Sequence, residues 1–210
     1  MGLCENKQLN INFKPAVFYA LTSGVGVEEV YPKARQEEID GCKNIPLRLS
    51  KYCAWKLLEI AVNEYIGLDF NKLSFKKSPF GKWECEEFYF SISHSGDLVS
   101  VCISPNMVGV DCQEVKPLKS GLEDKILTLK EMKIFNSLTA EEKEKFLLCV
   151  WCKKECLLKL CGEGTLNPSQ RETQDKEFLK SLLFINNKEY LLFACGKGID
   201  QNTLIKEIEL

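Results

Sequence analysis

Apolar and polar residues follow two different periods along this chain. Seven short stretches alternate in hydrophobicity or form compact apolar runs, which is the pattern of β-strands. These predicted strands cover residues 16–21, 88–93, 98–104, 108–111, 182–185, 190–194 and 203–208. The turn residues Ser95-Gly96-Asp97 and Asn186-Asn187 join four of the strands into two hairpins.

The longer spacing of amphipathic helices appears in three other stretches. The predicted helices run from 48 to about 66, from 125 to 137, and from a cap at 139–142 to glycines at 162 and 164. Ser50 is a candidate cap of the first helix, and Gly67 is its expected stop. Thr139-Ala-Glu-Glu142 has the spacing of a capping box. The segment 71–87 is expected to be a loop. Each half therefore contains a helix followed by a hairpin, which predicts two similar α+β units packed together.

The composition predicts the cellular compartment and argues against several classes of protein. The 210 residues are 45% hydrophobic and 28% charged, as in a globular protein with a substantial core. A formal net charge of −2 gives no argument for nucleic-acid binding. The chain lacks an apolar run of about 18 residues and shows no signal-peptide pattern, so no membrane span is expected. Eleven cysteines beside apolar neighbours fit reduced thiols, which predicts a soluble, cytoplasmic protein.

Four cysteines close together in the last predicted helix allow two interpretations. Cys149, Cys152, Cys156 and Cys161 have spacings that could hold zinc or an iron–sulfur cluster. The residues between them are good helix formers, however, and the first three cysteines share one helical face with Leu160. Free cysteine behaves as a small buried hydrophobe. The favoured interpretation is an apolar stripe, with a cysteine-liganded metalloprotein as an alternative.

Charged residues interrupt the same helix and the end of a strand. Asp111 ends the run Val108-Gly-Val, and Glu155 and Lys159 lie one helical turn apart. Lys154 points roughly 100° away from Glu155. An ordinary surface ion pair is the simplest interpretation, but charges in apolar surroundings are costly unless paired or coordinated. Two carboxylates with lysines nearby indicate a divalent cation and a polyanion, such as Mg²⁺ and a phosphoanhydride.

Several motifs, in order and spacing, resemble one enzyme family. Val-Gly-Val-Asp111 followed by Trp151-x-x-Lys154-Glu155-x-x-x-Lys159 looks like the paired signature of the 4′-phosphopantetheinyl transferases. The similarity extends to three further segments: Phe80-Gly81-Lys82, Ser91-Ile-Ser93-His94-Ser95-Gly96, and Gly162-x-Gly164 with Pro168. The tandem length resembles the monomeric Sfp-type branch. The resemblance implies that family's α+β fold, with two similar α/β subdomains (1–105 and 106–210) related by pseudo-twofold symmetry and the active site at their interface.

The resemblance also implies a reaction. A serine hydroxyl of an apo acyl or peptidyl carrier protein would attack the β-phosphate of coenzyme A, the co-substrate, and 3′,5′-ADP would leave. Asp111 and Glu155 would hold Mg²⁺, with Mn²⁺ as an alternative. Glu155 would be the general base, and Lys159 would stabilise the pyrophosphate. His94 and Ser93 would contact the nucleotide, and Arg48, Lys82 and Lys154 are further candidates for its phosphates.

One position departs from the family pattern. Many relatives carry a second acid two residues after the aspartate, where this chain has Gln113. We therefore expect two carboxylates at the metal, with Gln113 as a weak ligand or a partner of bound water. A non-catalytic homologue that binds coenzyme A or a carrier protein is the alternative function. Carrier proteins are generally acidic, so the apolar and basic segment 125–135 is the expected docking face, with Glu131 in a structural role.

Overall fold

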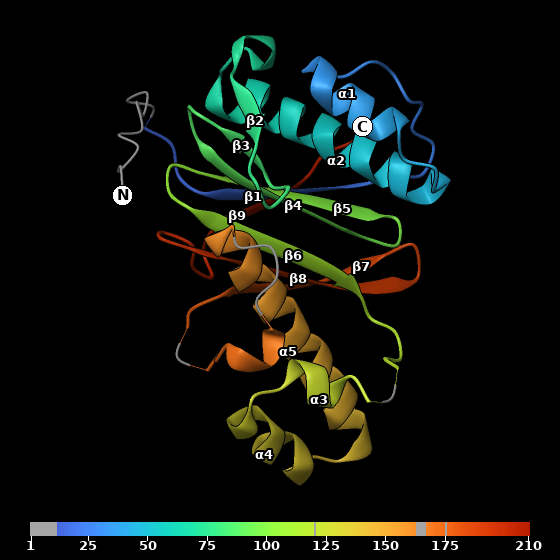
Figure 1. The fold of residues 1–210 in the computed structure, drawn as a ribbon, viewed down its shortest axis with the longest axis vertical. Coiled ribbons are helices and arrows are strands. Elements are labelled where there is room, and N and C mark those ends of the chain that lie inside the picture. Colours follow the sequence, from blue (N-terminus) through green and yellow to red (C-terminus); the bar gives the residue numbers. More distant parts are fainter. Residues whose placement is uncertain (1–11, 120, 163–166, 175) are drawn as a thin grey trace.

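The computed structural model describes residues 12–119, 121–162, 167–174 and 176–210. These residues form four layers in the order helix, sheet, sheet, helix (Figure 1). The first sheet contains β4 (Tyr89–Ser95), β5 (Leu98–Ser104), β1 (Ala16–Leu21) and β9 (Leu204–Glu207), in that order. The second contains β6 (Val108–Glu114), β8 (Lys188–Gly196) and β7 (Leu179–Ile185). The mixed α/β content expected from the sequence is confirmed.

Helix α2 (Ile45–Ala61) covers the outer face of the first sheet, and α1 (Lys33–Asp40) packs against α2. Helix α2 begins earlier than predicted because the Asn44 side chain caps it, accepting a hydrogen bond from the Leu47 amide. Ser50 is therefore not the cap, and its hydroxyl donates to the Pro46 carbonyl inside the helix. A π-turn at Val62–Ile66 follows, and Gly67 ends it with φ of 77°, as predicted. The short helix α1 was not predicted.

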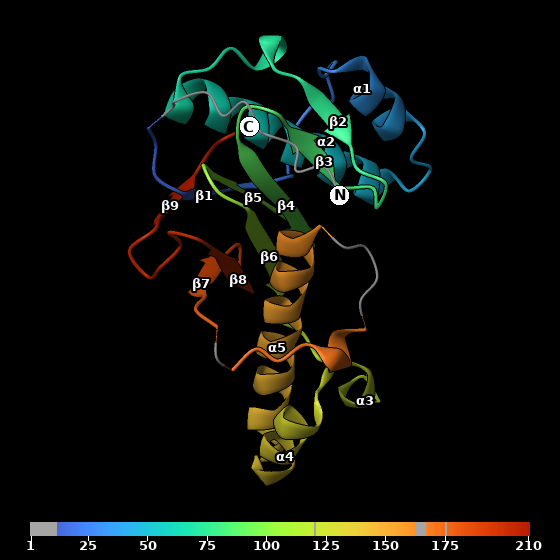
Figure 2. The same ribbon diagram turned by 60° about the vertical axis from the view of Figure 1, so that its left-hand side comes forward.

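Helix α5 (Ala140–Cys161) covers the outer face of the second sheet (Figure 2). Its predicted capping box is confirmed, with Thr139 and Glu142 bonded to each other's backbone amides. Gly162 ends the helix in the left-handed conformation, with φ of 68°. Gly164, the second predicted stop, lies outside the described residues. None of the helices in the described ranges is long and apolar enough to cross a membrane.

The helix predicted at 125–137 is two helices, α3 (Glu123–Ile126) and α4 (Leu129–Ser137). Thr128 separates them because it forms a capping box with Glu131 and so starts a new helix. The segment expected to be a loop at 71–87 contains a small hairpin of β2 (Phe75–Lys77) and β3 (Trp83–Cys85). Short 3₁₀ turns lie at Phe70–Lys72 and Pro168–Gln170.

Both predicted hairpins are confirmed, as β4–β5 and β7–β8. Asn186 and Asn187 have φ of 50° and 60°, which suits the turn between two twisted antiparallel strands. In each half, the first strand pairs antiparallel with the second strand of the hairpin, β1 with β5 and β6 with β8. Strand β9 pairs parallel with β1, so residues after 105 complete the first sheet. A boundary at 105 consequently does not separate the strands of the two sheets.

Candidate active site

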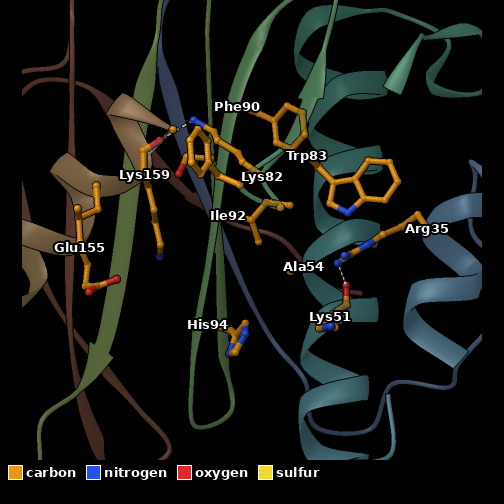
Figure 3. A pocket seen from close by; sticks show the side chains of 15 residues that line it. Arg35, Lys51, Ala54, Lys82, Trp83, Phe90, Ile92, His94, Glu155 and Lys159 are labelled. Atoms are coloured by element: carbon orange, nitrogen blue, oxygen red, sulfur yellow. Dashed lines mark hydrogen bonds between the residues drawn. The ribbon is translucent and has the colours of Figure 1, made fainter. Parts of the chain in front are cut away.

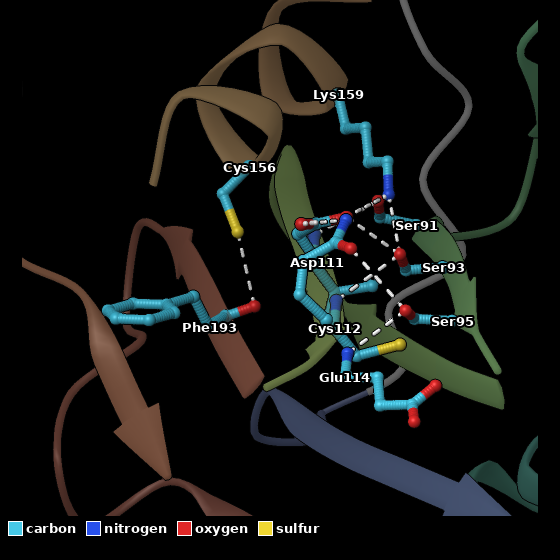
Figure 4. Close-up of polar contacts among 11 residues, drawn as sticks. Ser91, Ser93, Ser95, Asp111, Cys112, Glu114, Cys156, Lys159 and Phe193 are labelled. Atoms are coloured by element: carbon cyan, nitrogen blue, oxygen red, sulfur yellow. Dashed lines mark hydrogen bonds and ion pairs between the residues drawn. The ribbon is translucent and has the colours of Figure 1, made fainter. Parts of the chain in front are cut away.

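The two sheets meet along a seam between β4 and β6, which contact each other but belong to different sheets. Alternate serine hydroxyls of β4 accept hydrogen bonds from alternate backbone amides of β6 (Figure 4). The pairs are Ser91 with Val110 (3.1 Å), Ser93 with Cys112 (3.3 Å) and Ser95 with Glu114 (3.0 Å). Because side chains point to one face at every second position of a strand, this serine ladder leaves His94 on the opposite face of β4.

Helix α5 approaches β6 very closely at Gly109. A Cβ built on Gly109 would overlap the carbonyl oxygen of Cys156 and lie 2.9 Å from the backbone nitrogen of Leu160. Only a residue without a side chain permits this approach. The approach brings Glu155 and Lys159 to the strand that carries Asp111.

We expect Gly109→Ala to lower the free energy of unfolding by about 1–3 kcal/mol, the usual cost of overpacking. The added methyl group would meet backbone atoms of α5, so the helix must move away from β6. Gly26→Ala is the matched control, because a Cβ there meets nothing within 4 Å. Urea unfolding of both variants measures the difference, and equal midpoints would contradict the close approach.

Asp111 and Lys159 form an ion pair between β6 and α5, with Lys159 Nζ 2.8 Å from Asp111 Oδ1. Asp111 is only 2% exposed. Burial acts to lower the pKa of Lys159, but the Asp111 carboxylate outweighs it and raises the pKa above its ordinary value. Lys159 is therefore a fixed positive charge beside Asp111, which lies in the middle of β6 and not at the strand end that the sequence predicted.

Glu155 lies one turn before Lys159 and faces a cavity. Its pKa is raised by burial and by the charge of Asp111, against a smaller lowering by Lys159. A carboxylate held near another carboxylate suits a divalent cation, which would relieve their repulsion. Within the described ranges, no group of three or more His, Cys, Asp or Glu side chains gathers as metal ligands. Asp111 and Glu155 are the two carboxylates here that could hold Mg²⁺, with phosphate and water oxygens as its other ligands.

Gln113 lies beside Asp111, on the same face of β6. Its side-chain amide nitrogen donates to Asp111 Oδ2 at 3.2 Å, and its amide oxygen accepts from Ser95 at 3.4 Å. An amide nitrogen does not ligate a cation, so in this orientation Gln113 orients the carboxylate. Direct coordination by Gln113 would require its amide to turn over.

The cavity beside these residues has a volume of about 440 Å³ and lies between α5 and α2 (Figure 3). Glu155 and Lys159 form one wall. Basic and apolar side chains line the rest, together with the aromatic rings of Phe80, Trp83 and Phe90. The basic groups are Arg35, Lys51, Lys82 and His94. A cavity with basic walls, aromatic rings and two acids at one end suits a nucleotide with several phosphates.

Glu38 binds several of the basic and aromatic side chains on one side of this cavity. Its carboxylate accepts hydrogen bonds from Trp83 (2.7 Å), Lys77 (3.0 Å) and Lys51 (3.1 Å), and Arg35 lies at 3.2 Å. Burial acts to raise the pKa of Glu38, but these partners outweigh it and lower the pKa to about 2. Three cations around one carboxylate leave this wall positive.

We expect Glu38→Gln to reduce the loss of stability that the protein suffers in acid. Because the folded pKa is about 2 against an ordinary 4.5, the ionised carboxylate stabilises the fold above about pH 4.5, and this contribution is lost as pH falls towards 2. Urea unfolding at pH 7, 4.5 and 3 measures the slope. The neighbouring Glu37→Gln, at a side chain that is 67% exposed, is the control. A slope unchanged by Glu38→Gln would contradict the assignment.

The structure brings five of the predicted site residues together. Asp111 and Gln113 lie on β6, Glu155 and Lys159 on α5, and Ser93 joins them through a hydrogen bond to Asp111. Lys82 and His94 line the adjoining cavity. The Lys82 amine also donates to the Lys159 carbonyl near the end of α5. The pKa of His94 is lowered by loss of solvation in the cavity wall and by the charge of Lys159, so the ring tends to be neutral.

Two predicted nucleotide contacts lie elsewhere. Lys154 is 0% exposed and faces away from the cavity, paired with Glu131 at the base of α4. This position corrects the expectation that Lys154 binds coenzyme A and confirms the structural role of Glu131. Arg48 is not among the residues that line the cavity, and its guanidinium pairs with Asp40 at 3.0 Å. Lys51, one turn later on α2, occupies the cavity wall instead.

Two basic residues of the cavity were not predicted from the sequence, Arg35 and Lys51. Arg35 lies on a helix whose weak amphipathic pattern gave no signal, and its guanidinium packs 4.8 Å from the Trp55 ring. Lys51 lies three residues after Arg48, so the helical period could have indicated it.

The predicted apolar stripe of α5 is confirmed, because Cys149, Cys152, Cys156 and Leu160 all belong to or pack against one apolar cluster. Cys152 and Cys156 are 0% exposed and pack with Leu148, Phe193 and their neighbours. The Cys156 thiol donates to the Phe193 carbonyl at 3.2 Å. Cys149 is partly buried, and Cys161 is exposed at the end of the helix.

Comparisons with known proteins show which sequences this chain is similar to. Residues 107–199 match the family model of the 4′-phosphopantetheinyl transferase superfamily. The chain is similar to 4′-phosphopantetheinyl transferase psf-1 of Bacillus pumilus, with 29% identity over 111 residues, which are 51% of this chain and 48% of that protein. It is 25% identical over 115 residues to the transferase ffp of Bacillus subtilis, and 23% over 115 to Sfp of its strain 168, covering 53% of this chain and 51% of each relative. The matched part therefore spans about half of these relatives.

Proposed function

Because the chain belongs to the 4′-phosphopantetheinyl transferase superfamily and resembles its Sfp-type branch, we propose that it transfers 4′-phosphopantetheine from coenzyme A to a carrier protein. The observation that carries the proposal is the meeting of Asp111, Glu155 and Lys159 at one end of a basic cavity. Acids for a cation, a fixed lysine and a nucleotide-sized basic cavity are the parts that transfer of a phosphoryl group requires.

The reaction forms one P–O bond and breaks another. The hydroxyl oxygen of a carrier serine attacks the β-phosphorus of coenzyme A, and the bond from that phosphorus to the bridging oxygen breaks. Phosphopantetheine becomes esterified to the serine, and 3′,5′-ADP leaves with the bridging oxygen. Glu155 takes the serine proton, directly or through water, and its raised pKa suits a general base.

Lys159 stabilises the negative charge that develops on the leaving phosphate. Its ammonium is already held at the site by Asp111, so little reorganisation is needed. Asp111 and Glu155 are the residues that would hold Mg²⁺. A bound metal ion would neutralise part of the negative charge of the pyrophosphate.

The opposite end of the cavity binds the nucleotide in this proposal. His94 extends from β4, and Lys82 extends from the turn between β2 and β3. Arg35 and Lys51 extend from α1 and α2. The positive charges of Lys82, Arg35 and Lys51 suit the 3′-phosphate and the pyrophosphate, and the neutral His94 ring offers a hydrogen-bond donor. Arg48 stays a candidate at the margin, one turn from Lys51.

We also propose the finer features of the fold. The matching strand orders β4-β5-β1 and β7-β8-β6, each covered by one helix, support two subdomains related by pseudo-twofold symmetry, with the site between them. The subdomains would be residues 1–105 and 106–210, with β9 returning to the first. A site assembled within one chain supports a monomer.

The surface of helix α4 is the proposed docking site for an acidic carrier protein. Leu129 is 86% exposed and Ile134 is 39% exposed, and Lys130 and Lys133 lie on the same short helix. Exposed apolar groups beside lysines fit the acidic surfaces that carriers generally present.

The test is to incubate the protein with coenzyme A, Mg²⁺ and several apo acyl and peptidyl carrier proteins, and to measure the intact masses of the carriers. We expect a mass increment of one phosphopantetheine group. It should disappear with a chelator, and with a carrier whose acceptor serine is alanine. Coenzyme A binding without any increment on several carriers would refute catalysis and favour the alternative of a non-catalytic homologue, which the neutral Gln113 keeps open.

A further inference from the structure

Glu38 lies where four elements meet at one side of the cavity. Its Oε2 atom accepts hydrogen bonds from the Trp83 indole nitrogen at 2.7 Å and from the Lys77 amine at 3.0 Å, and Arg35 Nη1 lies 3.2 Å away. Its Oε1 atom accepts a hydrogen bond from the Lys51 amine at 3.1 Å. One carboxylate of α1 therefore joins α1, α2 and both strands of the β2–β3 hairpin.

This carboxylate contacts the cavity wall from behind. Arg35, Lys51 and Trp83 line the cavity, whereas Glu38 is not among the described residues that do so. The three lining side chains lie on the side of the cavity opposite Glu155 (Figure 3). In the proposed reaction the pyrophosphate lies at Glu155, so a phosphate on the opposite side is a different one. Coenzyme A carries one further phosphate, at the 3′-position of its ribose.

The contacts with Glu38 leave donors of both cations for that phosphate. A lysine ammonium has three hydrogens, and Lys51 gives one of them to Glu38. Arg35 donates from Nη2 to the Lys51 carbonyl at 3.0 Å, while its buried Nε atom has no hydrogen-bond partner among the described residues. A side chain that is already held in place loses less conformational freedom when it binds a ligand.

We infer that Glu38 is a positioning residue that holds Arg35 and Lys51 ready for the 3′-phosphate and so favours coenzyme A over 3′-dephospho-coenzyme A. The inference rests on the proposed function, which supplies the ligand. The charge of Glu38 acts in the opposite direction, because a carboxylate beside these cations weakens their attraction for a phosphate. Glu38 therefore favours binding through geometry, and variants that separate charge from geometry test this.

The experiment measures the affinities for coenzyme A and for 3′-dephospho-coenzyme A by isothermal titration calorimetry. Glu38→Asp keeps the charge but is one methylene shorter, so it cannot reach all the partners of Glu38. We expect it to weaken coenzyme A binding about tenfold, the cost of immobilising two long side chains, and to change 3′-dephospho-coenzyme A binding less than about twofold. Glu38→Gln keeps the shape and loses the charge. It should also weaken coenzyme A binding, because its amide nitrogen cannot accept a hydrogen bond from a cation.

Glu59→Gln is the matched control. Glu59 pairs with Lys56 on α2 at 3.0 Å, and their side chains are 20% and 28% exposed, close to the 23% and 27% of Glu38 and Lys51. Neither Glu59 nor Lys56 is among the described residues that line the cavity. Glu59→Gln should leave both affinities unchanged. Thermal unfolding shows whether each variant is folded, and Glu38→Asp decides the question alone if Glu38→Gln is not.

Two results would overturn the inference. An equal loss of affinity for both ligands in Glu38→Asp would indicate a general distortion of the wall. Tighter coenzyme A binding by Glu38→Gln, with Glu38→Asp unchanged, would show that Glu38 acts through its charge. If the wild type binds coenzyme A but transfers nothing to a carrier, the proposed function fails, and the binding comparison still decides the role of Glu38. A wild type that binds neither ligand would refute both.

Discussion

Glu155→Gln is expected to lower the rate of transfer by about a thousandfold, within the range for loss of a general base. Glutamine has nearly the same shape, but it cannot accept the serine proton and removes a negative charge from the pair with Asp111. Intact-mass analysis of the carrier over time measures the rate. Glu144→Gln, at an exposed position of the same helix, should leave it unchanged.

The same variant should be more stable than the wild type at neutral pH. The folded pKa of Glu155 is raised, so the folded state binds its proton more tightly than the unfolded state does. Stability that depends on this proton is present at low pH and is lost as pH rises through the folded pKa. Removing the charge therefore favours the fold.

A Glu155→Gln protein that keeps the wild-type rate of transfer would contradict the role of Glu155 as general base and metal ligand.

Lys154→Met is expected to lower the free energy of unfolding by about 3–5 kcal/mol, because it leaves one partner of a buried ion pair alone. The side chains of Lys154 and Glu131 are each 1% exposed. Besides Lys154, Glu131 accepts hydrogen bonds from Thr173 and from the Thr128 amide, so the pair ties α4 and the 168–174 segment to α5. Urea unfolding measures the loss.

Two further variants separate this pair from a general effect of losing lysine. Lys145→Met removes the ion pair between Lys145 and Glu141, whose side chains are 70% and 81% exposed, and should leave the free energy of unfolding nearly unchanged. Adding Glu131→Gln to Lys154→Met should recover much of the loss, because the amide oxygen still accepts from the Thr128 amide. A stable Lys154→Met with a raised KM for coenzyme A would return Lys154 to the nucleotide site.

Local signals in the sequence were sufficient for most of the elements. The alternation on either side of Gly96 and the pair Asn186-Asn187 predicted both hairpins, since turn chemistry and strand period act over a few residues. The capping box at Thr139 predicted the start of α5 for the same reason. The failures were also local: Thr128 has the same type of capping box, and it divides a stretch that was interpreted as one helix.

The candidate site was predictable where helical geometry or motif spacing determined it. The i, i+4 spacing placed Glu155 and Lys159 together. Lys154 is rotated by about 100° around the helix from Glu155, which indicated that its side chain faces a different part of the protein. Arg35 and Ser93 depended on tertiary contacts, with Trp55 and with Asp111, which no spacing in the sequence records. The sequence could name Ser93 as a site residue, but its bonding partners required the packing of β4 against β6.

The parallel pairing of β9 with β1 has a consequence for synthesis of the protein. Ala16 lies opposite Leu204, so the first sheet stays one strand short on the ribosome until the residues of β9 have been made. Contacts between residues so distant in sequence slow folding, because a long loop must close before they form. Until then, β1 presents unpaired backbone groups as a sheet edge. A gene divided at residue 105 would accordingly yield a first fragment with an exposed edge, prone to aggregation unless the second fragment is produced beside it.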